Sequence, residues 1–243
     1  MADLKVALVT GGGRGIGRAI SRRLASDGAV VFVNFARDRA AADATIAEIT
    51  EMGGTAIALR GDITDLAANL RLFEDVVDQA GRLDILINSA GIGVTGTFDS
   101  IDEVTYDRLF AITKGTYFAM RNAMQHIADN GRIISISTGL TRNWAARSAA
   151  YAGSKAAIEQ FTRSLSKEAG ARGITVNAVL PGVTQTDMTS GFSAAHLEAA
   201  RQQTSMGRLG QPEDIADVVA FLASEGARWV TGQLIVANGG STP

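Results

Sequence analysis

Seven short runs rich in β-branched residues recur along the chain, separated by longer segments whose apolar residues repeat with helical spacing. The runs are Val6–Thr10, Val30–Phe35, Thr55–Leu59, Ile85–Ile87, Ile133–Ile136, Ile174–Val179 and Leu234–Val236. The segments between them include Ile16–Ser26, Ala40–Glu51, Leu66–Ala80 and Ala156–Ala169. Strands that are apolar throughout and alternate with helices are typical of a parallel sheet covered by helices on both faces. The pattern predicts an α/β fold with a doubly wound parallel sheet.

Glycine ends most of the helical segments, just before the next strand. This is the position where a left-handed C-terminal cap is needed, and the glycines are Gly28, Gly53, Gly81, Gly131 and Gly173. No low-complexity linker and no internal repeat divides the chain. We therefore expect residues 1–243 to form a single domain.

Composition excludes several classes of function. A net charge of −2 gives no electrostatic footprint for nucleic acid or an anionic membrane, and the absence of cysteine excludes disulfide and thiolate chemistry. The two histidines have no partners at ligand spacing, so no metal site is expected. No apolar stretch reaches the ~18 residues of a membrane span, and Lys5 interrupts the N-terminal apolar run. We expect a cytoplasmic protein with no nucleic-acid or membrane partner.

The first strand is followed by the sequence TGGGRGIG, residues 10–17, which carries five glycines. Glycines let the backbone turn sharply and approach a pyrophosphate, while the next helix directs its N-terminal amides at the anion. The strict G-x-G-x-x-G register is absent, and Arg18 and Ala19 stand where a Walker-type loop needs Lys and Ser or Thr. The loop favours a dinucleotide-binding turn over the alternative of an ordinary flexible connection.

Two further strand ends carry small or hydroxyl side chains, in NSAG at 88–91 and PGVTQTDM at 181–188. Because the carboxyl ends of parallel strands meet at one edge, we expect them to share one elongated crevice with the glycine loop.

The sequence YAGSK, residues 151–155, places Tyr151 and Lys155 four residues apart. On a helix they would share one face. The pair could act as an ionisable unit, or it could be two exposed residues of a surface helix.

These motifs together resemble the short-chain dehydrogenase/reductase family over essentially the whole chain. The resemblance rests on TGGGRGIG, NSAG, YAGSK, GDI at 61–63, PGVTQT at 181–186 and TGQLIVANGG at 231–240, and it is nearest to the 3-oxoacyl-[acyl-carrier-protein] reductase branch. It implies a Rossmann-type NAD(P)-binding fold with a substrate lid around residues 187–208. It also implies a homotetramer with contacts from the helices around 102–128 and 148–170 and from the C-terminal strand.

The resemblance assigns Tyr151 as the general acid and base for a carbonyl or alcohol, with Lys155 lowering its pKa and holding the nicotinamide ribose. The family has a serine thirteen residues before the tyrosine. Here that position is Thr138, with the neighbouring Ser137 as the alternative, which would face the opposite side of the strand. The family's asparagine is replaced by Ile112 if the stretch is aligned on Gly115, or is deleted in the other alignment.

Cofactor preference depends on the end of the second strand. An acid there binds the ribose of NAD, whereas an arginine accommodates the 2′-phosphate of NADP. Arg37 and Arg14 favour NADP, with NAD as the alternative cofactor, and Asp38 is interpreted as a helix cap. The expected cofactor-binding residues are Gly11, Arg14, Gly15, Ile16, Gly17, Arg37, Asp62, Ile63, Asn88, Ala90, Gly91, Tyr151, Lys155, Pro181, Gly182, Thr184 and Thr186.

Two functions of different class fit these observations. The first is an NADP(H)-dependent oxidoreductase acting on a small-molecule carbonyl or secondary alcohol, with 3-oxoacyl thioesters among the substrates. The second is a catalytically silent NAD(P)-binding protein that serves as a sensor or oligomer partner. Trp144 with Arg142 and Arg147 is expected on the substrate side, where the arginines either meet an anionic substrate or are simply solvated.

Overall fold

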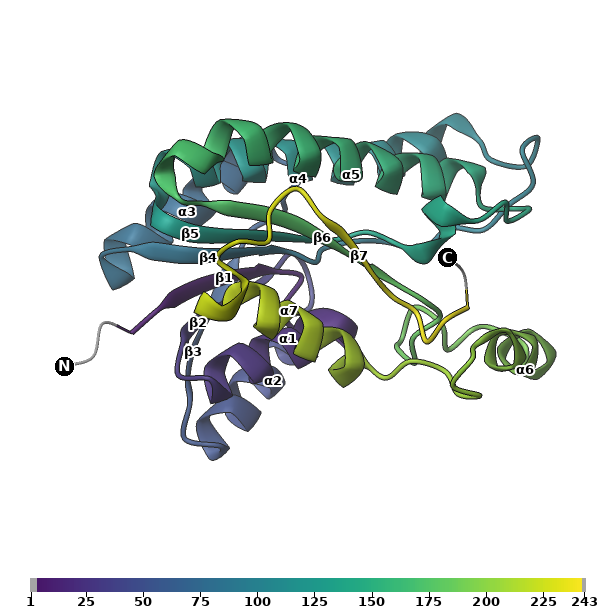
Figure 1. Cartoon of the computed structure of the whole chain (residues 1–243), viewed down its shortest axis with the longest axis horizontal. Coiled ribbons are helices and arrows are strands. Elements are labelled where there is room, and N and C mark those ends of the chain that lie inside the picture. The colour runs from purple at the N-terminus through teal and green to yellow at the C-terminus, as the bar shows by residue number, and fades with distance from the viewer. Residues whose placement is uncertain (1–3, 242–243) are drawn as a thin grey trace.

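A computed structural model describes residues 4–241 and contains one seven-stranded sheet in which every neighbouring pair is parallel (Figure 1). The strand order is β3-β2-β1-β4-β5-β6-β7, so the chain reverses its direction of winding between β1 and β4. The strands are β1 Val6–Thr10, β2 Val30–Phe35, β3 Thr55–Arg60, β4 Leu83–Asn88, β5 Ile127–Ile136, β6 Thr175–Pro181 and β7 Leu234–Ala237. The predicted Rossmann-type, doubly wound fold is confirmed.

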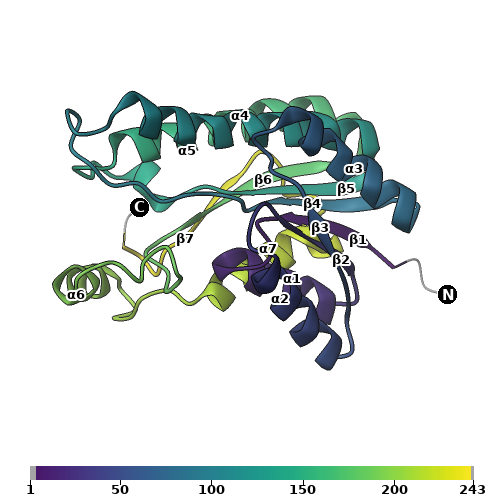
Figure 2. The same cartoon turned by 180° about the vertical axis from the view of Figure 1, so that it is seen from behind.

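Helices cover both faces of the sheet (Figures 1 and 2). One face carries α1 Gly15–Ser26, α2 Arg39–Glu51 and α7 Pro212–Ala223. The other carries α3 Leu66–Ala80, α4 Glu103–His126 and α5 Ala149–Ala169. The helix α6, Ala194–Gln203, lies apart from both layers, beyond the carboxyl ends of the strands (Figure 1). Among the helices of residues 4–241, none is long and apolar enough to cross a membrane.

The side chains of β1 divide between two buried clusters. Ala7 and Val9 pack with α1, α2 and α7, whereas Val6 and Leu8 pack with α3, α4 and α5. A strand's side chains alternate between the two faces of the sheet, so only a strand that is apolar at every position can serve both clusters. This is the physical reason why the continuous apolar runs predicted a sheet covered on both sides.

Four of the five predicted glycine turns have left-handed backbone: Gly28, Gly53, Gly81 and Gly173 have φ between 66° and 92°. The prediction was wrong for Gly131. Here α4 runs directly into β5, and the left-handed residue is Asn130, with φ 61°. Asparagine tolerates this region better than most residues with a side chain, so it can replace glycine in the turn.

The helix α5 begins at Ala149, earlier than the periodicity of residues 156–169 indicated. Tyr151 therefore lies in its first turn, and Lys155 follows one turn later. The apolar pattern missed this start because the first turn faces the site and is not part of the core.

Candidate active site

The carboxyl ends of β1, β4, β5 and β6 lie next to one another at one edge of the sheet. Thr10 is in register with Asn88, and Asn88 with Ser135. The winding reverses between β1 and β4, and ligands of doubly wound sheets bind at this kind of switch point. The strand ends predicted to share one crevice therefore do lie together.

The glycine loop packs closely against the end of β4. Gly11 has a φ of 64°, and a Cβ added there would lie 2.9 Å from the Cα atom of Ala90. A Cβ on Gly17 would collide with the carbonyl oxygen of Gly11. Gly15 lies beside Thr186, whose Cγ2 atom would be 3.3 Å from an added Cβ. The loop, Ala90 and Thr186 form a surface on which backbone is exposed to a ligand at close range.

The side chain of Asn34, at the end of β2, connects the ends of three strands. Its Oδ1 atom accepts a hydrogen bond from the Gly11 N–H at 3.3 Å. Its Nδ2 atom donates to the carbonyls of Leu59 at 3.1 Å and Gly61 at 2.9 Å. No sequence motif points to this residue, because its partners are 23 to 27 positions away.

Asn88 is buried at the end of β4 and donates to the hydroxyl of Ser135 at 3.2 Å. Its Oδ1 atom is buried with no hydrogen-bond partner. A buried orphan acceptor is costly. A donor supplied by a ligand at this strand end would remove that cost.

Arg14 and Arg37 lie beside the end of β2, both exposed. Arg14 forms an ion pair with Asp38 at 3.7 Å. The carboxylate of Asp38 accepts a hydrogen bond from Ala41 N–H at 3.0 Å and so caps α2, as predicted. Asp38 is therefore engaged in capping, while the side chain of Arg37 makes no hydrogen bond or ion pair within residues 4–241.

The turn after β3 fixes the register of α4. Asp62 accepts hydrogen bonds from the backbone and side chain of Thr64, and Ile63 packs its backbone against Gly115. A Cβ at Gly115 would collide with the Ile63 carbonyl, and Asn69 donates to the carbonyls of both residues. Gly115 is thus held within the unbroken helix α4, with Ile112 about one turn before it. That Ile112 occupies the place of the family's asparagine stays a prediction.

Tyr151 is half-buried in the first turn of α5, next to Thr138 at the end of β5. Burial raises the pKa of the Tyr151 phenol above its ordinary value, and a hydrogen bond with Thr138 partly offsets that rise. The hydroxyl oxygen of Thr138 accepts a hydrogen bond from the Leu140 N–H at 3.3 Å. The hydroxyl proton of Thr138 therefore remains available for donation to another oxygen.

Lys155 is buried, and its Nζ atom donates to the carbonyl of Ile136 at 2.9 Å. Burial lowers the pKa of Lys155 to about 8. In this structure desolvation of the phenol is the largest cause, so the net shift of the Tyr151 pKa is upward. Stabilisation of the Tyr151 phenolate by Lys155 stays a prediction. We also expected a carbonyl near Ile112 or an ordered water to accept from the lysine; the carbonyl that accepts lies on β5.

A cavity of about 10 Å³ separates Lys155 from α4 and is lined by Ile112, Thr113, Ser154 and Gly91, among others. The Thr113 hydroxyl lies 3.1 Å from the carbonyl of Ser154 and is thereby held away from the lysine. Ile112 thus faces the space in which an amide side chain could reach Lys155.

Ser137 is not available as an alternative to Thr138. Its hydroxyl donates to the buried carboxylate of Glu159, on α5, at 2.7 Å. Glu159 also accepts from the hydroxyl of Thr141 at 2.6 Å. Glu159 belongs to none of the sequence motifs, and its spacing of four from Lys155 is the one signal that the sequence carries for it.

After β6, Pro181 and Gly182 bring the chain back toward the site. The Thr184 hydroxyl donates to the Gly182 carbonyl at 3.1 Å, and Thr186 N–H donates to Thr189 at 3.0 Å. Met188 then reaches Gly93 after β4, where an added Cβ would lie 2.8 Å from its Cγ atom. The segment before α6 therefore touches the loop on the far side of the crevice.

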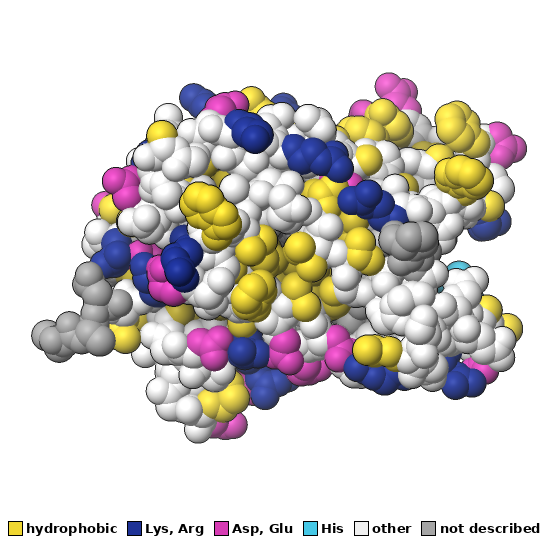
Figure 3. All heavy atoms as spheres, viewed as in Figure 1, with side chains coloured by type: hydrophobic (Ala, Val, Ile, Leu, Met, Phe, Trp, Pro, Cys, Tyr) yellow, Lys and Arg dark blue, Asp and Glu magenta, His cyan; other side chains and the backbone are white. Residues whose placement is uncertain are grey.

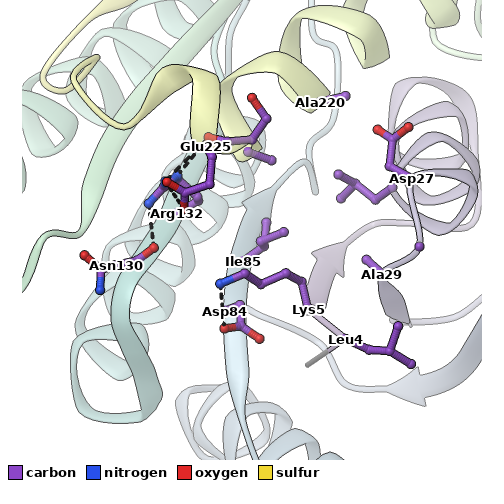
Figure 4. Close-up of a pocket in the computed structure, with 14 residues that line it drawn as sticks. Leu4, Lys5, Asp27, Ala29, Asp84, Ile85, Asn130, Arg132, Ala220 and Glu225 are labelled. Carbon is purple, nitrogen blue, oxygen red and sulfur yellow. Dashed lines mark hydrogen bonds and ion pairs between the residues drawn. The ribbon is translucent and has the colours of Figure 1, made fainter. Parts of the chain in front are cut away.

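A second pocket, of about 430 Å³, lies at the opposite edge, by the amino ends of β1, β4 and β5 (Figure 4). Its charged side chains already have partners in the chain: Lys5 pairs with Asp84, and the buried Arg132 with Glu225 and the Asn130 carbonyl. None of the buried side-chain polar atoms without a hydrogen-bond partner in residues 4–241 belongs to the lining of this pocket.

The donor set at the carboxyl edge fits a dinucleotide. In the glycine loop a Cβ at Gly11 or Gly17 would collide with neighbouring backbone, so the absence of side chains there lets a ligand approach closely. Helix α1 begins directly behind the loop. The Asn88 oxygen that has no hydrogen-bond partner lies next to the loop. Residues 4–241 contain no group of His, Asp or Glu side chains arranged to hold a metal ion.

Comparison with known proteins agrees with this geometry. A family model described as enoyl-(acyl carrier protein) reductase matches residues 11–242. An uncharacterized oxidoreductase of Methylorubrum extorquens is 44% identical over 97% of each chain. A probable tetrahydroxynaphthalene reductase of Zymoseptoria tritici is 40% identical over 98% of this chain and 94% of the relative.

Among solved structures, a short-chain dehydrogenase of Burkholderia cenocepacia in complex with NADP superposes with a TM-score of 0.93. It is 38% identical, over 98% of this chain and 97% of that one. The chain belongs to the short-chain dehydrogenase/reductase family. It is an oxidoreductase that acts on carbonyl or CH–OH groups with a nicotinamide dinucleotide.

Proposed function

We propose that the protein is an NADP(H)-dependent carbonyl reductase in which Tyr151 is the general acid. The observation that carries the proposal is the cluster of the buried Thr138 and Lys155 with the half-buried Tyr151 beside the glycine loop. A catalytically silent binding protein has no chemical need for an ionisable phenol at this place. A phenol that stays protonated at neutral pH is suited to give its proton to a carbonyl oxygen.

Each of the three side chains has a defined part in the reduction. Thr138 directs its hydroxyl proton at the carbonyl oxygen, and Tyr151 transfers its proton to that oxygen as the alkoxide forms. Lys155, held by the Ile136 carbonyl, is still mostly protonated at pH 7 with a pKa of about 8. Its positive charge stabilises the phenolate left behind. NADPH, when bound, supplies the hydride.

Two cations support the choice of NADP. The side chain of Arg37 is exposed and makes no hydrogen bond or ion pair among the described residues, and the side chain of Arg14 has only the weak, exposed ion pair with Asp38. Both could turn toward a 2′-phosphate at little cost. The Burkholderia relative, whose structure holds NADP, is consistent with this choice.

The entrance to the site favours a bulky apolar ketone over a small one. Trp144 is fully exposed just before α5, and Met188 is exposed on the segment that reaches Gly93. Arg147 has a left-handed backbone and accepts a hydrogen bond from Gly96 N–H, which ties the two loops of the entrance together. The probable tetrahydroxynaphthalene reductase among the relatives is named for a fused aromatic substrate. Residues 187–208 would close over such a substrate as a lid.

The test is reduction followed at the nicotinamide absorbance, with fused aromatic ketones and 3-oxoacyl thioesters as substrates. Tyr151→Phe should lower kcat by a factor of about 10²–10⁴, the usual contribution of general acid–base catalysis, without changing NADPH affinity. A Phe variant that retains wild-type turnover would show that Tyr151 is not the proton donor. Binding of NADPH without turnover of any carbonyl would support the silent alternative.

We also propose a homotetramer. Tyr106 and Tyr117 are exposed on α4, and Tyr117 packs edge-on against Phe161 of α5. Near the edge strand β7, Phe221 and Trp229 are exposed, and hydrophobic side chains gather in this region (Figure 3). Two separate apolar faces suit the two kinds of contact in a tetramer with dihedral symmetry. Light scattering that finds only a 25.4 kDa particle at micromolar concentration would contradict this assembly.

A further inference from the structure

Glu159 is a buried carboxylate on α5 that binds two hydroxyl groups next to Thr138. It is 5% exposed, and its Oε1 atom accepts short hydrogen bonds from two hydroxyls, at 2.6 and 2.7 Å. Hydrogen bonds to an ionised acceptor are roughly twice as strong as neutral ones. A buried carboxylate is also costly to leave without them. The two hydroxyls are therefore held firmly.

The two donors flank the residue that contacts Tyr151. Ser137 precedes Thr138 at the end of β5, and Thr141 follows it in the short 3-10 helix Gly139–Arg142. The backbone agrees with this arrangement: Ser137 N–H donates to Val179, and Thr141 N–H to the carbonyl of Thr138 itself. Thr138 therefore lies between two points that Glu159 fixes to α5.

The same face of α5 provides all three anchors. Tyr151, Lys155 and Glu159 follow one another at intervals of four, so they lie in a row along the helix. Tyr151 meets the Thr138 side chain, Lys155 binds the Ile136 carbonyl, and Glu159 binds the hydroxyls on either side of Thr138.

We propose that Glu159 is a positioning residue, which fixes Thr138 so that its hydroxyl points at Tyr151 and at the substrate oxygen. The inference rests on the proposed function. Threonine at a strand end can rotate about χ1, and a hydroxyl turned away cannot hold the carbonyl oxygen. Misplacement of a reacting group by about 1 Å can cost on the order of 10²-fold in rate.

A double-mutant cycle separates positioning from general stabilisation. Glu159→Met should lower kcat by about 10- to 100-fold while the Kd for NADPH stays within about twofold. In a Thr138→Val background, which has no hydroxyl to position, the same change should alter kcat by less than about threefold. Equal losses in both backgrounds would overturn the proposal. Glu159→Gln keeps an acceptor oxygen and should recover most of the activity, and Glu168→Met, at an exposed site on the same helix, is the matched control.

Thr141→Val provides the same cycle with a smaller perturbation if Glu159→Met does not fold. If the wild type turns over no substrate, the proposed function is wrong. The positioning role of Glu159 can then still be tested by ultraviolet titration of the Tyr151 phenol. The chain has three tyrosines, so the Tyr151→Phe spectrum is subtracted. Glu159→Met should shift the titration of Tyr151 to higher pH, because the hydrogen bond between Tyr151 and Thr138 is lost. In the Thr138→Val background, where that hydrogen bond is already absent, Glu159→Met should leave the titration unchanged. A titration unchanged from wild type would refute the positioning role.

Discussion

Lys155 should make the free enzyme less stable at neutral than at alkaline pH. Burial lowers its pKa from 10.5 to about 8. Between these values the unfolded chain holds a proton that the folded protein has released, so the free energy of unfolding rises with pH. At about 1.4 kcal/mol for each pH unit between the two pKa values, this gain is about 3 kcal/mol. The cost of the buried charge is fully present below pH 8 and is gone above 10.5.

Lys155→Met isolates this effect, since it removes the charge and keeps a side chain of similar length. Urea unfolding of both proteins, at one protein concentration and at several pH values from 7 to 10.5, gives the difference in their free energies of unfolding. We expect this difference to shift by about 3 kcal/mol in favour of wild type as the pH rises. Loss of the hydrogen bond to Ile136 offsets the whole curve by about 1 kcal/mol without changing its slope.

Lys167→Met is the control, because Lys167 is exposed on the same helix and should show no such shift. A difference between wild type and Lys155→Met that stays constant within about 0.5 kcal/mol across this range would refute the reasoning. It would mean that the buried amine is solvated well enough to keep its charge.

Three further predictions concern the cofactor and the helix beside it. Arg37→Asp should weaken NADPH binding and should narrow or reverse the protein's preference for NADPH over NADH, as measured by titrating wild type and variant with both cofactors. An unchanged affinity for NADPH would place the 2′-phosphate site at Arg14 instead. Gly17→Ala should abolish cofactor binding, because the added Cβ collides with the Gly11 carbonyl, and fluorescence titration with wild-type affinity would contradict this. Ile112→Asn should raise kcat, since the amide would face the cavity beside the buried lysine; unaltered kinetics would show that no amide is needed there.

The strands were predictable because a sheet buried on both faces requires continuous apolar runs, and few other folds produce seven of them. Their ends were less predictable where the chain changes element without a glycine. The transition from α4 to β5 at Asn130 is the clearest case, because the left-handed residue there is set by the turn and not by composition.

The site divides in the same way. Gly11, Tyr151 and Lys155 belong to contiguous motifs and could be found from spacing. Glu159 could not be assigned, because its partners are 18 and 22 residues away and a carboxylate on a helix is most often exposed. The surroundings of Ile112 also needed the structure, since only the fold shows that this residue lines the cavity beside Lys155.

Hydrogen bonds to Asn34 order the glycine loop already in the folded protein without a ligand. A loop with five glycines among residues 10–17 would be one of the most mobile stretches of the unfolded chain. In the folded protein the loop is already held by hydrogen bonds from Gly11 to the Asn34 side chain and from Gly12 to its carbonyl. The loop is therefore ordered at Gly11 and Gly12 before a nucleotide binds. The free energy of binding is then not reduced by the conformational entropy lost in ordering this part of the loop. Association should be limited by diffusion and orientation, and the amide proton of Gly11 should exchange slowly with solvent in the free protein.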